Sequence, residues 1–93
     1  MPPLQPVDTC ILDAINACEQ PAPLWACWAM ARRLHGDQVP LDDYAKKRLV
    51  RGAIGRLRAA RLVRLTGRRY EVTGKGWRRL RELRAGPLGA APT

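Results

Sequence analysis

Arginine and lysine side chains recur through the second half of this chain at spacings that would gather them on shared surfaces. Residues 46–93 carry a formal net charge of +13, whereas residues 1–45 carry −4. A separation this steep predicts a positive face that attracts polyanions over a Debye length, about 8 Å at physiological salt. Such a face would bind phosphate groups, and nucleic acid is the first candidate ligand, with an anionic membrane surface as the second. The longest apolar run, Leu24–Ala31, is far shorter than the roughly 20 residues of a spanning helix, so a soluble protein is expected.

Residue types that would support catalysis or metal binding are scarce. The chain contains no serine, no GxxxxGK phosphate loop and no HExxH metal motif. Cys10, Cys18 and Cys27 lack CxxC spacing, and the first two would lie about 12 Å apart on one helix, too far for a disulfide. We expect free thiols in a reducing cytoplasm. His35 stands alone near a predicted helix end, so we expect it to interact with the helix dipole there rather than to bind a ligand. The sequence therefore predicts a protein that is not an enzyme and uses no cofactor or metal.

The first half of the chain indicates two helices. Residues 1–7 are rich in proline and are expected to form a flexible arm, and Asp8 is a good N-cap for a first helix. Its inward positions follow helical spacing: Ile11, Leu12, Ile15 and Cys18. Prolines end that helix, and a second is expected from about Pro23 to Leu34, with Gly36 at a left-handed exit. The inward stripe of this second helix is predicted to be Leu24, Cys27, Trp28 and Ala31.

Trp25 and Met30 lie outside that stripe, on a helix that is apolar nearly all round. If exposed together, they would form the kind of apolar patch that marks an interface. Three interpretations stay open: a homodimer contact, contact with a different protein partner, or a core that is larger than the stripe.

A third helix is expected after a loop at residues 37–41, capped by Asp42 or Asp43 and running to about Ala60. Its apolar stripe consists of Val50, Ala53, Ile54 and Leu57. The opposite face gathers Tyr44, Lys47, Arg48, Arg51, Gly55 and Arg58. Because that face has no acidic residue beyond the capping turn, ion pairs along the helix do not explain its charge. One face of this helix is predicted to be core and the other cationic.

Beyond the third helix the apolar period changes from 3.6 to 2, which indicates a short hairpin with its turn at Thr66–Arg68. The inward positions of the hairpin are predicted to be Val63, Leu65, Tyr70 and Val72. Thr73 then caps a last helix from Gly74 to about Ala85. The inward positions of this helix are predicted to be Trp77, Leu80 and Leu83. The expected fold is mainly α with a small β-hairpin, in one domain over residues 8–85, with Trp28 and Trp77 in the core and a disordered tail at 86–93.

Two stretches of the second half resemble a known family pattern. They are RLRAARLVR at residues 56–64 and GRRYEVTGKG at residues 67–76. Together with three helices, a two-stranded hairpin and a closing helix, they are similar to the winged helix-turn-helix family. The resemblance covers roughly residues 8–83. The chain departs from the pattern at Arg61, where many relatives carry glycine because that position often adopts a positive φ at the helix exit.

The resemblance implies a protein that binds double-stranded DNA, with the third helix in the major groove and the wing along the backbone or in the minor groove. By position, the DNA-facing residues would be Lys46, Lys47, Arg48 and Arg51 on the helix and Arg68 and Arg69 at the wing tip. Tyr44 and Arg58 share the same helix face. An arginine can bind either a guanine edge or a phosphate, and both possibilities stay open.

The first functional hypothesis is a transcriptional regulator that binds double-stranded DNA. At this size it would dimerise on an operator with two half-sites. The alternative is a winged-helix interaction module, an inhibitor or adaptor that docks an acidic protein or a nucleoprotein complex. A third possibility is an architectural DNA or RNA binder with little sequence preference.

Overall fold

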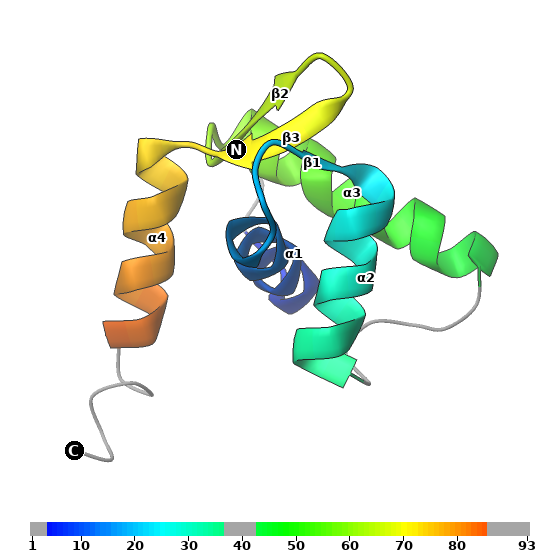
Figure 1. Cartoon of the computed structure of the whole chain (residues 1–93). Coiled ribbons are helices and arrows are strands. Elements are labelled where there is room, and N and C mark those ends of the chain that lie inside the picture. Colours follow the sequence, from blue (N-terminus) through cyan, green and yellow to red (C-terminus); the bar gives the residue numbers. More distant parts are fainter. Residues whose placement is uncertain (1–3, 37–42, 86–93) are drawn as a thin grey trace.

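Four helices and a three-stranded antiparallel sheet form the part of the chain that the computed structural model describes, residues 4–36 and 43–85, with side chains for 4–36 and 48–83 (Figure 1). The elements are α1 (Pro6–Ala17), β1 (Ala22–Pro23), α2 (Leu24–His35), α3 (Asp43–Ala59), β2 (Val63–Thr66), β3 (Arg69–Val72) and α4 (Gly74–Ala85). Figure 1 shows α1 in the middle, with α2 and α4 on opposite sides of it and the sheet across one end. The expected loop at 37–41 and tail at 86–93 lie outside the described residues.

The first helix begins at Pro6 with Gln5 as its N-cap, three positions earlier than the predicted cap at Asp8. Proline is tolerated in a first helical turn because the N–H that it lacks would have no partner there. Asp8 is therefore not the cap but the third helical residue, and its carboxylate accepts a hydrogen bond from the Gln5 backbone N–H at 2.9 Å. The predicted arm is thus shorter, since Gln5–Val7 already belong to the start of the helix.

Asp8 also joins α1 to α3 through a buried ion pair that sequence analysis did not predict. The Asp8 side chain is fully buried, and Arg56 donates two hydrogen bonds to its two oxygens, both at 2.8 Å. This bidentate geometry fixes both position and angle of the guanidinium. Asp8 raises the pKa of Arg56 above its already high ordinary value, mainly by accepting these hydrogen bonds. The pair therefore holds the two helices in register.

The sheet has three strands in the order β1-β3-β2, where a two-stranded hairpin was predicted. Ala22 pairs with Tyr70 and Pro23 with Arg69, and the side chain of Gln20 accepts a hydrogen bond from the Val72 N–H at 2.7 Å. A strand of two residues, one of them proline, has no apolar alternation, so no sequence pattern indicates it. It fastens the α1–α2 connection to the turn end of β3, at Arg69 and Tyr70.

The hairpin itself has the predicted register. Val63 pairs with Val72 and Leu65 with Tyr70, which places these four side chains on one face of the two strands. Gly67 has a φ of +65° at the first position of a two-residue turn, the conformation that a type II′ hairpin requires there.

The turn between α3 and β2 is a Schellman motif with an arginine in the left-handed position. Arg61 donates its N–H to the carbonyl oxygen of Arg58, and Leu62 donates to that of Leu57, both at 2.9 Å. Arg61 has a φ of +62°, although the residue is not glycine. A side chain with a Cβ costs roughly 1–2 kcal/mol in this conformation.

Thr73 and Gly76 lock the start of α4 onto this turn. Thr73 caps the helix as predicted, because its hydroxyl oxygen accepts the Gly76 N–H at 3.0 Å, while the same hydroxyl donates to the Arg61 carbonyl at 2.7 Å. A Cβ on Gly76 would lie 2.1 Å from the carbonyl oxygen of Leu62, so only glycine allows this approach. The end of α3, the end of β3 and the start of α4 therefore meet at one rigid junction.

The core is aliphatic and centres on α1 and α3. All four residues of the predicted α3 stripe are buried, as are Ile11, Leu12 and Ile15 of α1, whereas Cys18 is half-buried at the C-cap of α1. The predicted α2 stripe of Leu24, Cys27, Trp28 and Ala31 is buried or packed against the core, and Met30, which was placed outside it, packs there as well. Gly36 ends that helix with the expected positive φ of +52°, but its ψ of −117° lies outside the left-handed helical region.

Three residues predicted to point inward are instead substantially exposed. Trp77 is 49% exposed and Leu83 42%, while Leu80 between them is buried. The main contacts of α4 are with α1 and β3, and they cover Leu80 in the middle of its apolar stripe while Trp77 and Leu83 stay open. Leu65, near the tip of the hairpin, is also exposed at 41%. The periodicity identified the apolar faces correctly but could not show how much of each face a neighbour covers.

Candidate nucleic-acid interface

The outer face of α3 presents a row of exposed basic side chains. Arg48, Arg51 and Arg58 are exposed, with exposed Gly55 between the last two, while the opposite face of the helix is buried in the core. At 1.5 Å per residue this row is about 15 Å long. The cationic helix face predicted from the sequence is therefore present for these arginines. Tyr44, Lys46 and Lys47 belong to α3, but their side chains lie outside the described residues.

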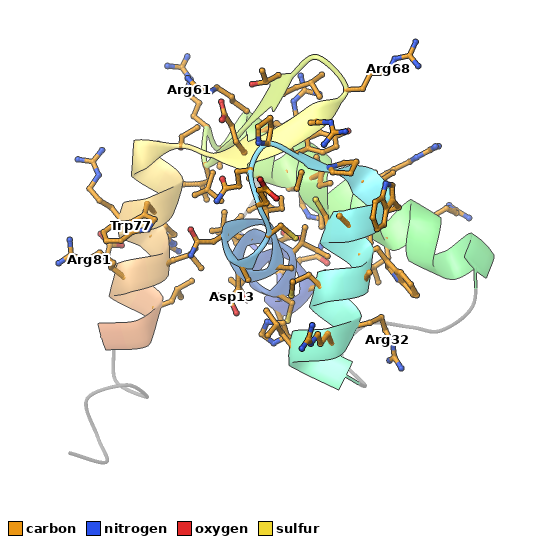
Figure 2. The ribbon with its side chains drawn as sticks, in the orientation of Figure 1. Asp13, Arg32, Arg61, Arg68, Trp77 and Arg81 are labelled. Atoms are coloured by element: carbon orange, nitrogen blue, oxygen red, sulfur yellow. The ribbon has the colours of Figure 1, made fainter. Side chains whose placement is uncertain are left out.

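The hairpin tip carries the two predicted wing arginines in different positions. Arg68 is an exposed turn residue, and Figure 2 shows its side chain projecting from the tip into solvent. Arg69 is the first residue of β3, opposite Pro23 of β1, and it lines a depression beside Trp25 of α2. The structure therefore groups Arg69 with α2, whereas Arg68 extends beyond the sheet.

A groove of about 620 Å³ runs between the end of α3 and β2, and the sequence analysis had not predicted it. Its lining consists of Gly55, Arg58, Ala59, Arg61, Val63, Arg64, Leu65 and Thr73. Arg58 comes from the helix, Arg61 from the Schellman turn and Arg64 from the strand. Arg61 and Arg64 had not been assigned to the site, because the spacing 58, 61, 64 crosses three kinds of local structure and has no single period. Only the tertiary fold brings these three arginines to one groove.

Arg64 is oriented by a neighbouring acid. It donates a hydrogen bond from Nε to Glu71, its cross-strand partner, and the hydroxyl of Thr66 donates to the same carboxylate oxygen at 3.1 Å. These hydrogen bonds, Arg64 first, lower the pKa of Glu71 from its ordinary value. The cation at the groove is thus partly neutralised but held in place.

Charge in this region is almost entirely of one sign. Residues 44–70 contain ten lysines and arginines and no aspartate or glutamate. The two nearest acids that the structure pairs with this segment are Asp8, buried against Arg56, and Glu71, bound to Arg64. The surface formed by α3, the groove and Arg68 is therefore strongly electropositive, which suits a polyanion.

A second surface surrounds Trp25 on α2. Trp25 is 74% exposed, and beside it lies a depression of about 440 Å³ lined by Ala17, Cys18, Glu19, Pro23, Trp25, Ala26, Ala29, Met30, Arg33 and Arg69. Met30 is half-buried and packs against the core cluster. The interpretation of Trp25 as part of a larger core is wrong, because its indole faces solvent, whereas Met30 belongs partly to the core.

The cations of α4 interact within the helix. The guanidinium of Arg81 lies 5.1 Å from the centre of the Trp77 ring, and Arg79 pairs with Glu82 at 3.7 Å. Figure 2 shows Trp77 and Arg81 on the far side of the molecule from Arg68. These side chains are therefore separate from the wing tip.

The histidine and the cysteines are held in local contacts or buried. No group of three His, Cys, Asp or Glu side chains in the described ranges could hold a metal ion, and His35 bonds to Asp13 at 3.1 Å. Burial raises the pKa of all three thiols, that of Cys27 to about 12, which keeps them protonated and unreactive at neutral pH. In residues 4–36 and 43–85 no helix combines the length and the apolar character needed to cross a membrane.

Comparison with known proteins gives no assignment. No protein-family model, curated protein or solved structure matches this chain. The functional interpretation therefore depends on the geometry and charge described above.

Proposed function

We propose that this chain is a winged helix-turn-helix protein that binds double-stranded DNA and regulates transcription. The observation that carries the proposal is the exposed arginine face of α3, which adjoins an arginine-lined groove and a cationic hairpin tip. An α-helix with its side chains is about 10–12 Å across, and the major groove of B-DNA is about 12 Å wide. The outer face of α3 therefore has suitable dimensions and charge to enter it.

The arrangement of elements supports the same interpretation. Three helices, a hairpin and a closing helix follow one another in the order expected for the family, with β1 as an additional short strand. Because β1 pairs with Arg69 and Tyr70 of β3, the hairpin is supported up to its turn, and Arg68 in that turn stays exposed. Three free cysteines fit a cytoplasmic setting.

The first test is binding to a fluorescently labelled DNA duplex, measured by anisotropy over a range of salt concentrations. Log affinity should fall linearly with log salt, by about 0.9 per phosphate neutralised. Arg51→Gln and Arg58→Gln should each weaken binding and reduce this slope. Arg78→Gln, which removes an equally exposed charge from α4, is the matched control and should have little effect. Equal losses in all three variants would show a response to net charge alone and would contradict a specific role for α3.

A regulator must also distinguish sequences. Selection of bound duplexes from a random pool at physiological salt should enrich a motif, and Arg51→Gln should alter or abolish that motif if α3 contacts bases. An architectural binder would enrich none, and an interaction module would retain no duplex.

We further propose that the Trp25 surface joins two copies of the chain. The rim of its depression carries both an acid, Glu19, and a cation, Arg33, both exposed. A two-fold contact brings the same patch together from both sides, so Glu19 of one copy can face Arg33 of the other while each indole fills the opposite depression. Two half-sites of an operator would then be read by one dimer.

Sedimentation of the purified protein tests this second proposal. Trp25→Ala and Glu19→Arg should each shift the protein towards monomer. The charge-swapped double variant, Glu19→Arg with Arg33→Glu, should restore the dimer. A wild-type protein that stays monomeric at all concentrations used, or a double variant without rescue, would refute the two-fold contact.

A further inference from the structure

Arg61 occupies a backbone conformation that favours glycine. Its φ of +62° makes it the one non-glycine residue with positive φ within the described ranges. Strain of this kind persists only where the surrounding structure enforces it, and it is found preferentially at functional sites. A role for the cationic side chain would explain why arginine, and not glycine, occupies this position.

The surrounding contacts fix this conformation from both sides. The Arg61 N–H is held by the carbonyl of Arg58 at 2.9 Å, and the Arg61 carbonyl accepts the Thr73 hydroxyl at 2.7 Å. The next residue is held as well, since the Thr73 N–H donates to the Leu62 carbonyl at 3.0 Å. The backbone that carries the Arg61 side chain is thus preorganised and does not have to be ordered on binding.

The Arg61 side chain belongs to the groove between α3 and β2. Arg58 and Arg64 line the same groove, and among the described residues its lining includes no acidic side chain. Figure 2 shows Arg61 and Arg68 projecting from the same end of the molecule, where the sheet lies. Arg64 is held from the strand side by Glu71. Three arginines from three different elements therefore line one open groove.

We infer that this groove is a phosphate-binding site for one strand of the duplex backbone, with Arg61 as its central contact. The inference rests on the proposed function and adds Arg61 and Arg64 to the residues of the α3 face and the wing tip. A guanidinium presents several N–H donors in a fork that matches phosphate oxygens. Because the backbone of Arg61 and the side chain of Arg64 are held by neighbours, less conformational freedom is lost when the phosphates bind.

The inference predicts opposite effects of Arg61→Gly on folding and on binding. Glycine relieves the strain, so the melting temperature should rise, by about 4–8 °C for each kcal/mol released in a domain of this size. The same change removes one phosphate contact, so the slope of log affinity against log salt should fall by about 0.9, roughly an eightfold loss of affinity at about 0.1 M salt. Arg61→Lys keeps the charge and the strain, and it should leave both values close to wild type.

The experiment measures melting temperature and duplex anisotropy for wild type, Arg61→Gly, Arg61→Lys and the control Arg78→Gln. Salt slopes unchanged in Arg61→Gly, while Arg51→Gln still weakens binding, would overturn the groove and leave the proposed function standing. A wild-type protein without salt-dependent duplex binding would overturn both. Sodium phosphate should compete no better than sodium chloride at equal ionic strength. Stronger competition that Arg61→Gly abolishes would assign the groove to a free phosphate anion and overturn the backbone assignment.

Discussion

The buried ion pair between Asp8 and Arg56 should be the most sensitive polar contact in the fold, and its two halves should not be equally sensitive. Asp8 is fully buried, whereas the Arg56 side chain keeps 26% of its surface exposed. Removing Arg56 would leave a carboxylate in the interior with the Gln5 N–H as its remaining donor. Removing the acid would leave a cation that can still turn towards water. The loss of Arg56 should therefore cost more stability than the loss of the Asp8 charge.

The magnitudes follow from burial. An uncompensated buried charge costs about 3–5 kcal/mol, so Arg56→Met should destabilise by about that amount. Asp8→Asn keeps one acceptor oxygen and releases a partly exposed partner, so a loss of about 1–3 kcal/mol is expected. A domain of this length has a total stability of about 5–14 kcal/mol, so Arg56→Met should remove a large part of it.

Urea unfolding followed by circular dichroism gives the free energies of unfolding directly. Arg58→Met, two positions further along the same helix and exposed, is the matched control and should change stability by no more than about 0.5 kcal/mol. Should Arg56→Met unfold at the same urea concentration as Arg58→Met, or lose less than Asp8→Asn, the assignment of the buried charge would be wrong.

Three further outcomes are expected. Gly76→Ala should lower stability by about 1–3 kcal/mol in thermal unfolding, because its Cβ would lie 2.1 Å from a backbone oxygen. Gly74→Ala is the control, since a Cβ there meets open space and should not destabilise. Equal effects of the two variants would refute the close approach. Glu71 has a lowered pKa, so its contribution to folding stability is present above the ordinary value of 4.5 and is lost as the pH falls through the folded-state value. The difference in Tm between wild type and Glu71→Gln should therefore be seen at neutral pH and disappear in acid. A difference that widens in acid would contradict the pairing. Cys27 is fully buried with a pKa of about 12, so it should resist iodoacetamide at pH 8 until the protein unfolds, while half-buried Cys18 reacts earlier. Peptide mass mapping would show the order of labelling. Early labelling of Cys27 would contradict its burial.

Local patterns in the sequence were sufficient for most of the helices and for the hairpin. The stripe from Val50 to Leu57 repeats at helical spacing, and Val63 to Val72 alternates around a glycine turn, so each pattern has one consistent solution. The exposed arginines of α3 followed from the same helical geometry, because a buried stripe fixes which residues face outward.

Features that depend on contacts between distant segments could not be predicted in this way. Asp8 and Arg56 are 48 positions apart, and nothing near either residue indicates the other. The groove arginines have no shared periodicity, and β1 is too short to have one. For Trp77, the apolar spacing was correct, but the exposure depends on how far α4 stands from its neighbours. Sequence patterns therefore identified the faces, and the tertiary structure was needed to show what covers them.

The strand order β1-β3-β2 leaves two outer margins, each with backbone groups available to a neighbouring molecule. Pro23 occupies one of them and has no N–H to donate, and that strand is two residues long. The other margin is four residues long and carries Arg64, whose charge repels a second molecule of the same kind. Both margins are therefore poor templates for strand addition, so a protein stored at high concentration for DNA-binding work should resist β-type aggregation.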